Sequence, residues 1–169
     1  MKENEMRLEG LAPLLPEKPE VLILGSMPSV QSLVKGEYYG NPRNHFWPIL
    51  FSLYQEKPVS SYKEKQDFLN RWGIALWDTI GSCIRPGSLD ANIKEAIPND
   101  IAGLLKDYPS IHLIACNGAK SYDMLRKYEK EHPLRNGIEI RKLPSSSPIP
   151  GRNIKNLEEK TLAWKKILL

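Results

Sequence analysis

Short apolar runs that end in glycine or a polar residue recur along this chain of 169 residues, and amphipathic segments separate them. The clearest runs are VLILG at 21–25 and IHLIACNG at 111–118, while IALWDTI at 74–80 and IEIRKLP at 138–144 are more mixed. Runs of this kind are typical of strands buried on both faces. Strands that alternate with helices build a parallel sheet covered by helices. We therefore predict an α/β fold, a three-layer sandwich with a central, mainly parallel four-stranded sheet flanked by helices.

Five amphipathic segments supply the helices of this prediction: 44–55, 62–73, 99–109, 119–133 and 154–169. Pro48 fits only in a first helical turn, so the first helix should begin near residues 43–45. Gly73 should end the second helix, and Asn99 or Asp100 should cap the third. The length suits one domain with a sizeable core, so we take residues 1–169 as a single domain.

The composition excludes several classes of protein. No apolar run approaches the roughly 18–20 residues that a membrane span needs. The N-terminal segment lacks the continuous apolar stretch of a signal peptide, so we expect a cytoplasmic protein. Cys83 and Cys116 form no CxxC motif and no cluster with histidine, which gives no indication of a metal site. Two reduced, buried thiols are expected instead.

The net charge of +4 is mild, but basic residues gather near the C-terminus. Between residues 133 and 156 five basic side chains stand against a single acid, Glu139; they are Arg135, Arg141, Lys142, Arg152 and Lys155. Such an excess suits contact with a nucleic-acid backbone. A solvated surface cluster without a ligand is the alternative.

Three of the predicted strands end in unusual loops: GSMPS at 25–29, CNG at 116–118 and LPSSSP at 143–148. The carboxyl ends of parallel strands meet at one edge of the sheet, where ligands bind in α/β folds. We therefore expect these loops to converge on a binding site.

The GSMPS loop carries no familiar catalytic motif. Phosphate-binding GxGxxG and GxxxxGK[ST] are absent throughout, as are GxSxG and HExxH. Ser26 is a weak candidate for a nucleophile, because none of the three histidines comes with an evident orienting acid. Gly25 is expected to permit a tight turn, and Met27 has no proton to give or take.

The loop YYGNPRNHFW at 38–47 combines flat aromatic rings with amides. Tyr38 and Tyr39 could stack on a base, and Asn44 could hold a water or read the edge of a heterocycle. The alternative for Asn44 is the N-cap of the following helix. We expect Phe46 and Trp47 to belong to the core.

The other two loops also suit an extruded nucleotide. The amide of Asn117 donates and accepts, which fits the Watson–Crick edge of a base, although an Asx turn before Gly118 is the alternative. The serines at 145–147 could hold a phosphate, and Ile149 and Pro150 could act as apolar wedges in the base stack. A proline-stiffened surface loop is the alternative here.

In chain order, the segments GSMPS, YYGNPRNHFW, GIALWDTI, GSLDANI, CNG and LPSSSP span most of the sequence. This pattern resembles the uracil-DNA glycosylase superfamily, most closely its hypoxanthine-DNA (deoxyinosine) glycosylase branch. The resemblance implies a monofunctional DNA repair glycosylase without metal or cofactor. Such an enzyme extrudes a damaged base from double-stranded DNA and hydrolyses its N-glycosidic bond, which leaves an abasic site. We expect it to act as a monomer.

The resemblance also implies roles for single residues. Asn44 matches the catalytic amide, Tyr39 the aromatic that stacks on the base, and Asn117 the base-reading position. Gly25, Ser26 and Met27 would complete the base pocket, with Met27 where most of the superfamily has the Asn or Asp that positions water. The residues implied to contact DNA are Ser145, Ser146, Ser147, Pro148, Ile149 and Arg152.

Two departures from the superfamily pattern bear on the substrate. Asn41 stands where relatives often have histidine, and the segment SSSPIPGRN lacks the histidine that stabilises an anionic uracil. A purine leaving group, most readily hypoxanthine, therefore fits better than uracil. The alternatives are a uracil or G:T/U mismatch glycosylase, a catalytically inactive DNA-binding module, and a small nucleoside hydrolase.

Overall fold

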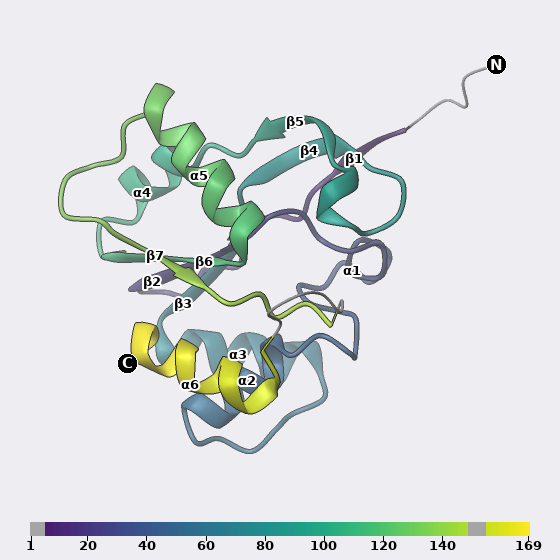
Figure 1. The fold of residues 1–169 in the computed structure, drawn as a ribbon. Coiled ribbons are helices and arrows are strands. Elements are labelled where there is room, and N and C mark those ends of the chain that lie inside the picture. The colour runs from purple at the N-terminus through teal and green to yellow at the C-terminus, as the bar shows by residue number, and fades with distance from the viewer. Residues whose placement is uncertain (1–5, 149–154) are drawn as a thin grey trace.

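A four-stranded parallel sheet forms the centre of the computed structural model, which describes residues 6–148 and 155–169. Its strands are β2 (Val21–Gly25), β3 (Ile74–Asp78), β6 (Leu113–Asn117) and β7 (Glu139–Leu143). They lie in the order β3-β2-β6-β7, and all three pairings are parallel (Figure 1). The predicted central sheet is confirmed.

Helices cover both faces of this sheet (Figure 1). On one face lie α2 (Phe46–Leu53), α3 (Tyr62–Trp72) and α6 (Leu157–Leu168), and on the other α4 (Ile101–Asp107) and α5 (Ala119–Glu131). Side chains alternate between the faces of a strand, so Ile23 packs with the first group of helices and Leu22 with the second. The three-layer sandwich is confirmed.

The aromatic part of the core lies under α2 and α6. The rings of Phe46 and Trp164 are fully buried and meet edge to face, with centroids 5.9 Å apart. Trp47 meets Phe46 in the same way at 4.9 Å. The prediction that Phe46 and Trp47 belong to the core is confirmed.

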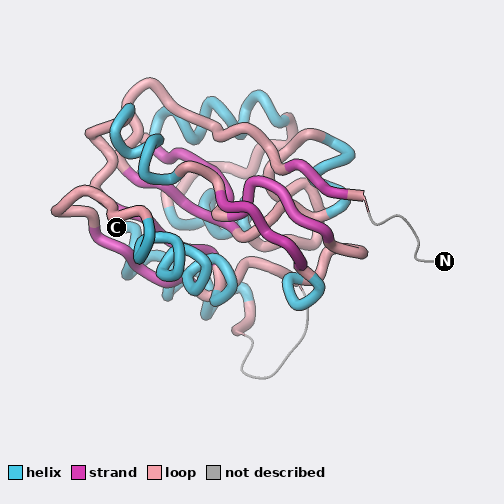
Figure 2. Tube along the Cα trace, turned by 90° about the horizontal axis from the view of Figure 1, so that it is seen from above, coloured by secondary structure: helices cyan, strands magenta, loops and turns pink. Residues whose placement is uncertain are grey.

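A second, antiparallel sheet was not predicted. It consists of β1 (Arg7–Glu9), β4 (Ile80–Ile84) and β5 (Lys94–Pro98) in the order β1-β4-β5 (Figures 1 and 2). The predicted strand 74–80 in fact ends at Asp78, and β4 begins after a single residue. Two short elements near this sheet were also missed, α1 (Val30–Lys35) and the 3-10 turn η1 (Asp90–Asn92).

Helix ends follow the predicted signals. Gly73 adopts φ +66° after α3, and the side chain of Asp100 accepts from Gly103 N at the start of α4. Pro48 is the third residue of α2, within its first turn. On α6, Lys160 and Trp164 are buried while Leu157 is exposed.

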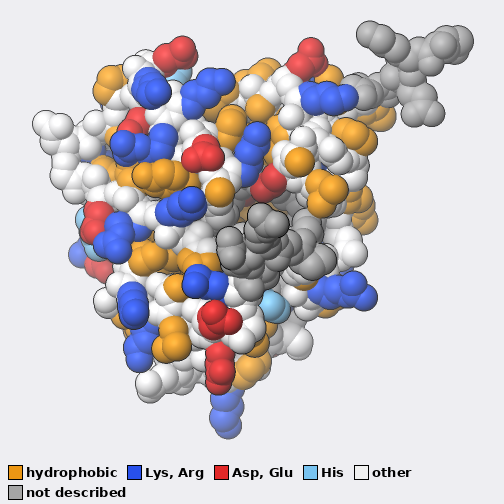
Figure 3. Space-filling view, viewed as in Figure 1, with side chains coloured by type: hydrophobic (Ala, Val, Ile, Leu, Met, Phe, Trp, Pro, Cys, Tyr) orange, Lys and Arg blue, Asp and Glu red, His pale blue; other side chains and the backbone are white. Residues whose placement is uncertain are grey.

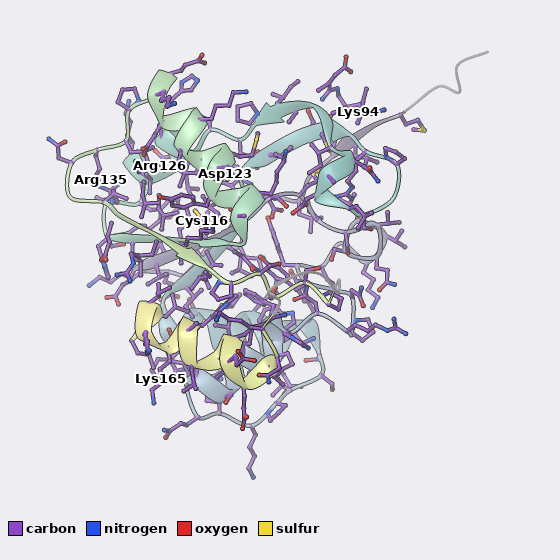
Figure 4. The ribbon with its side chains drawn as sticks, viewed as in Figure 1. Lys94, Cys116, Asp123, Arg126, Arg135 and Lys165 are labelled. Carbon is purple, nitrogen blue, oxygen red and sulfur yellow. The ribbon has the colours of Figure 1, made fainter. Side chains whose placement is uncertain are left out.

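The two cysteines are free and buried, as predicted. Cys116 lies on β6 beneath α5 (Figure 4), where burial raises the pKa of its thiol to about 12. A thiol with such a pKa stays protonated at neutral pH and is a poor nucleophile. Within the described part of the chain, no helix is long and apolar enough to cross a membrane.

Two glycines with the same backbone conformation test how packing adds to backbone strain. Gly73 has φ +66° and Gly36 has φ +67°. A Cβ at Gly73 would lie 3.1 Å from Lys18 O, whereas none of the described atoms lies within 4 Å of a Cβ at Gly36. A left-handed conformation costs an alanine about 1–2 kcal/mol. We expect Gly73→Ala to lower the free energy of unfolding more than Gly36→Ala does, as measured by urea denaturation. Equal losses would contradict a packing contribution at Gly73.

Candidate active site

A cavity of about 990 Å³ opens at the carboxyl edge of the parallel sheet. All three predicted loops and the aromatic loop line it, which confirms their convergence. The predicted site residues among its lining are Gly25, Ser26, Met27, Tyr39, Asn44, Asn117, Ser145, Ser146, Ser147 and Pro148. The predicted DNA contacts Ile149 and Arg152 lie outside the described residues.

Gly25 leaves room for a carboxyl group. It pairs in register with Asp78 of the neighbouring strand. A Cβ at Gly25 would lie 2.4 Å from Asp78 Oδ1, closer than real Cβ atoms approach, and 3.1 Å from Tyr39 Oη, which is tighter than most Cβ contacts. Its φ is not in the left-handed region. Gly25 therefore does not supply a left-handed conformation to the turn, and the close approach of Asp78 is what favours glycine here.

Asp78 is a buried carboxyl group that lines the cavity and that sequence reasoning missed. It is 4% exposed, and its Oδ2 atom has no hydrogen-bond partner among the described residues. Burial, and secondarily the charge of Asp90, raise the pKa of Asp78 to about 7, although Arg85 acts in the opposite direction. Asp78 is therefore a carboxyl group that can carry a proton at neutral pH.

The GSMPS loop is held by contacts with the second sheet. Ser26 Oγ donates to Asp90 Oδ1 at 2.7 Å, and Ile80 N donates to Ser26 O at 3.0 Å. Met27 is buried and packs against Ile80 and Cys83 while also lining the cavity. Because the Ser26 hydroxyl points its proton at a carboxylate rather than at a histidine, the geometry does not support a serine nucleophile.

Asn117 joins three loops through its side chain. Its Nδ2 donates to Tyr39 Oη at 3.2 Å and to Ser146 Oγ at 2.9 Å. Its Oδ1 accepts from Ser146 N at 2.9 Å. These hydrogen bonds run to distant segments, so the side chain of Asn117 links separate loops rather than forming a local Asx turn. Ser146 is buried by them, and its predicted contact with DNA stays a prediction.

Tyr39 has a strained backbone and a partly covered ring. Its φ is +54°, a conformation that costs a bulky residue on the order of 1–3 kcal/mol and often marks a functional site. The ring stacks on Phe46 at a centroid distance of 3.8 Å, and the partly exposed residue lines the cavity. Tyr38 is buried, and its hydroxyl donates to Ala12 O at 2.9 Å. The prediction that Tyr38 stacks on a base is therefore wrong.

The amide of Asn44 is oriented by the helix that follows it. Its Oδ1 accepts from Phe46 N, the first residue of α2, at 2.9 Å. His45 is the N-cap residue of α2 and Asn44 precedes it, so the N-cap alternative is wrong, although this hydrogen bond occupies part of the amide. Nδ2 makes no hydrogen bond with the described residues, and the half-buried side chain lines the cavity. Asn44 is thus held in place with a donor available to a water or a ligand.

The side of the cavity away from Asp78 is basic. Lys142 and Lys155 line it together with Lys160, another residue that sequence reasoning missed. Lys160 is 2% exposed; its Nζ donates to Ser147 O at 3.2 Å and lies 3.1 Å from Nδ1 of His45. Burial, followed by the charge of Lys160, lowers the pKa of His45, so the neutral ring accepts a hydrogen bond from the ammonium.

The predicted basic cluster divides between two ends of the molecule. Arg135 donates to the main-chain carbonyls of Leu105 and Ile111 at the amino-terminal end of the strands, away from the cavity (Figure 4). Arg141 pairs with Glu139 at 3.0 Å. In Figure 3, Lys and Arg side chains are spread among apolar patches rather than gathered into one stripe.

The missed residues had recognisable signals. Asp78 ends the apolar run IALW in the same way that Asn117 ends IHLIAC. Asp90 lies within the GSLDANI segment, and Lys160 lies four residues before the buried Trp164 on α6. Within the described ranges, no three His, Cys, Asp or Glu side chains are arranged to hold a metal ion.

Comparison with known proteins identifies the family. The model described as the uracil DNA glycosylase superfamily matches residues 12–168. The chain belongs to this superfamily. A hypoxanthine DNA glycosylase from Methanosarcina acetivorans is 38% identical and matches over 88% of this chain and 92% of its own. Another protein of that name from Methanosarcina barkeri is 37% identical over 94% of this chain and 96% of its own.

Two further proteins are similar to this chain, one in sequence and one in structure. A G/U mismatch-specific uracil DNA glycosylase from Schizosaccharomyces pombe is 28% identical over 62% of this chain and 32% of its own. The solution NMR structure of a Methanosarcina acetivorans protein described as a uracil DNA glycosylase has a TM-score of 0.78 and 35% identity, covering 96% of this chain and 99% of that one. The predicted superfamily and fold are confirmed.

The raised pKa of Asp78 predicts a specific dependence of stability on pH. Between its ordinary value of 3.8 and about 7, the folded chain keeps a proton on Asp78 that the unfolded chain has lost. The unfolded state is therefore favoured as pH rises through this range. We expect Asp78→Asn, which cannot ionise, to gain stability relative to the wild type between pH 4 and pH 8. Urea denaturation at several pH values measures this, and a constant difference would contradict the buried, neutral carboxyl.

Proposed function

We propose that this chain is a DNA glycosylase that flips hypoxanthine out of double-stranded DNA and hydrolyses its N-glycosidic bond, leaving an abasic site. The names of the two Methanosarcina relatives support the reaction and the base. The observation that carries the proposal is the amide of Asn44, which the first N–H of α2 holds at the wall of the cavity while its Nδ2 has no partner among the described residues.

The chemistry of the bond explains what Asn44 does. Cleavage builds positive charge on the sugar and negative charge on the departing base, so the enzyme must bring a water to the sugar and stabilise the base. The oxygen of an amide is barely basic, so Asn44 orients this water and does not deprotonate it. Tyr39 stacks on the base, and Asn117 hydrogen-bonds the base once its present partners yield.

The walls of the cavity suit the two parts of a flipped nucleotide. Lys142, Lys155 and Lys160 lie on the side of β7 and α6, next to the loop of Ser145 and Ser147. We place the DNA phosphates on this side, because cations and hydroxyl groups hold phosphate oxygens. Ile149 and Arg152 extend this contact in the proposal. We further propose that residues 1–169 act as one domain, as a monomer and in the cytoplasm.

Uracil is the second candidate base. The Schizosaccharomyces relative, named for G/U mismatches, supports it, but that relative matches over a smaller part of this chain. An inactive DNA-binding module is the alternative from another class. Met27 is apolar and buried, so the first motif supplies no polar side chain at this position. Asn44 and Asp78 still give the cavity polar groups suited to chemistry.

Substitution of Asn44 tests the catalytic role. We expect Asn44→Ala to slow excision of hypoxanthine by at least about 100-fold, because water is no longer oriented. Binding of the duplex should be nearly unchanged. Single-turnover cleavage of a labelled duplex and fluorescence anisotropy measure the two quantities.

Two controls separate this effect from a loss of folding. Asn44→Ser keeps an oxygen that can cap Phe46 N while losing the amide, so it should be inactive but as stable as the wild type. Asn136 is an exposed asparagine before β7, and Asn136→Ala should leave the rate unchanged. Turnover retained in Asn44→Ala would remove Asn44 from catalysis.

A panel of duplexes separates the candidate bases. Each duplex carries one hypoxanthine, uracil, xanthine or mismatched thymine, and alkaline cleavage reports the abasic product. We expect hypoxanthine to be released fastest, because no histidine in the last loop stabilises an anionic uracil. Faster release of uracil would favour the second candidate. Binding of the duplexes without any excision would instead support the inactive module.

A further inference from the structure

Asp78 is a polar group of the cavity to which the proposed function assigns no task. Orienting the water, stacking on the base and contacting phosphate are all assigned to other residues. It ends β3 at the carboxyl edge of the sheet, and the residue is only 4% exposed. Among the described residues, Oδ2 has no partner, although buried polar atoms are almost always hydrogen-bonded. Asp78 itself lines the cavity, so its carboxyl group, with one oxygen unsatisfied among the described residues, is suited to act on a ligand there.

The surroundings of Asp78 favour its protonated form. Asp90 from η1, Tyr38 and Tyr39 from the aromatic loop, and Arg85 after β4 are the titratable groups that act on it. The guanidinium of Arg85 donates to the carbonyls of Pro28 and Gly87, both at 2.7 Å, and forms no salt bridge with Asp78 among the described contacts.

A protonated carboxyl has an O–H to donate. A buried acid beside a second carboxylate is the usual way in which enzymes keep such a proton at neutral pH. Asp90 is exposed and accepts from Ser26, so its environment differs from that of Asp78. The two carboxyl groups are thus placed in different surroundings, one dry and one wet.

We propose that Asp78 is a general acid of this glycosylase and transfers its proton to N7 of the departing purine. The inference rests on the proposed function and adds the step that makes a purine a good leaving group. Its geometric basis is the position of Asp78 among the residues that line the cavity, the lack of a partner for its Oδ2 atom among the described residues, and the glycine at position 25 that makes room for the carboxyl.

The step balances in atoms and charge. The bond between C1′ and N9 breaks, and its electron pair moves into the imidazole ring of the purine as N7 takes the proton from the carboxyl group of Asp78. The oriented water bonds to C1′ and releases a proton to solvent. Hypoxanthine then leaves as a neutral molecule, and the carboxylate of Asp78 takes up a proton before the next turnover. Uracil has no N7, so Asp78 can assist the release of a purine but not of uracil.

The test pairs Asp78→Asn with a substrate that lacks the proton acceptor. Two labelled duplexes carry either 2′-deoxyinosine or 7-deaza-2′-deoxyinosine, in which a C–H replaces N7. General acid catalysis typically contributes about 100- to 10,000-fold. We expect Asp78→Asn to slow cleavage of the deoxyinosine duplex at least 100-fold, and the wild type to be slowed comparably on the 7-deaza duplex. The variant should lose little more on the 7-deaza duplex, because both changes remove the same proton transfer.

A matched control and a second measurement keep the test decisive. Asp123 is an exposed aspartate on α5 (Figure 4), and Asp123→Asn should behave as the wild type. If Asp78→Asn does not fold, the wild type alone decides through its pH profile. Its rate on deoxyinosine should fall as pH rises through about 7, where Asp78 loses its proton, while its rate on the 7-deaza duplex should not. A ratio of the two rates that is constant with pH would overturn the proposal.

The outcomes also separate this inference from the proposed function. If the wild type excises hypoxanthine and Asp78→Asn is equally fast, Asp78 is not the acid and the function stands. Independent, multiplicative losses from the two changes would have the same meaning. If the wild type leaves the deoxyinosine duplex intact, the proposed function fails and the role of Asp78 fails with it.

Discussion

The parallel register of β2 with its neighbours is the constraint on which the site depends. It sets Gly25 beside Asp78 and brings Asn117 to the same edge of the sheet. Because Gly25 has no side chain, the carboxyl of Asp78 can sit against the end of β2. Asn117 then fastens the loops of Tyr39 and Ser146 over this edge. Loops far apart in the sequence therefore enclose one cavity.

The order of the strands also places different polar groups on the two sides of the cavity. Asp78 ends β3 at one edge of the sheet, and Lys142 lies on β7 at the other. Lys160 from α6 joins the basic side, where it is held by Ser147 and His45. A flipped nucleotide has a phosphate that needs cations and a base that needs directed hydrogen bonds. The two sides of the cavity meet these needs separately.

Local patterns predicted much of the fold. The apolar runs, the helix-ending Gly73 and the capping Asp100 act within a few residues, so the sequence shows them directly. The second sheet was missed because β1 has three residues and β4 follows β3 after one residue, which leaves little pattern to detect. Lys160 was missed because a buried lysine depends on acceptors from distant segments.

By itself the sequence determined the α/β class, the superfamily and most residues that line the cavity, because strand periodicity and ordered motifs are properties of the chain. The tertiary structure alone decided why position 25 is glycine, how Asn117 uses its amide, and that Asp78 is buried with an oxygen that has no partner among the described residues. These properties arise from contacts between segments dozens of residues apart. Burial and the charge of spatial neighbours set the protonation of a carboxyl group, and neither can be read from the residues adjacent to it in the sequence.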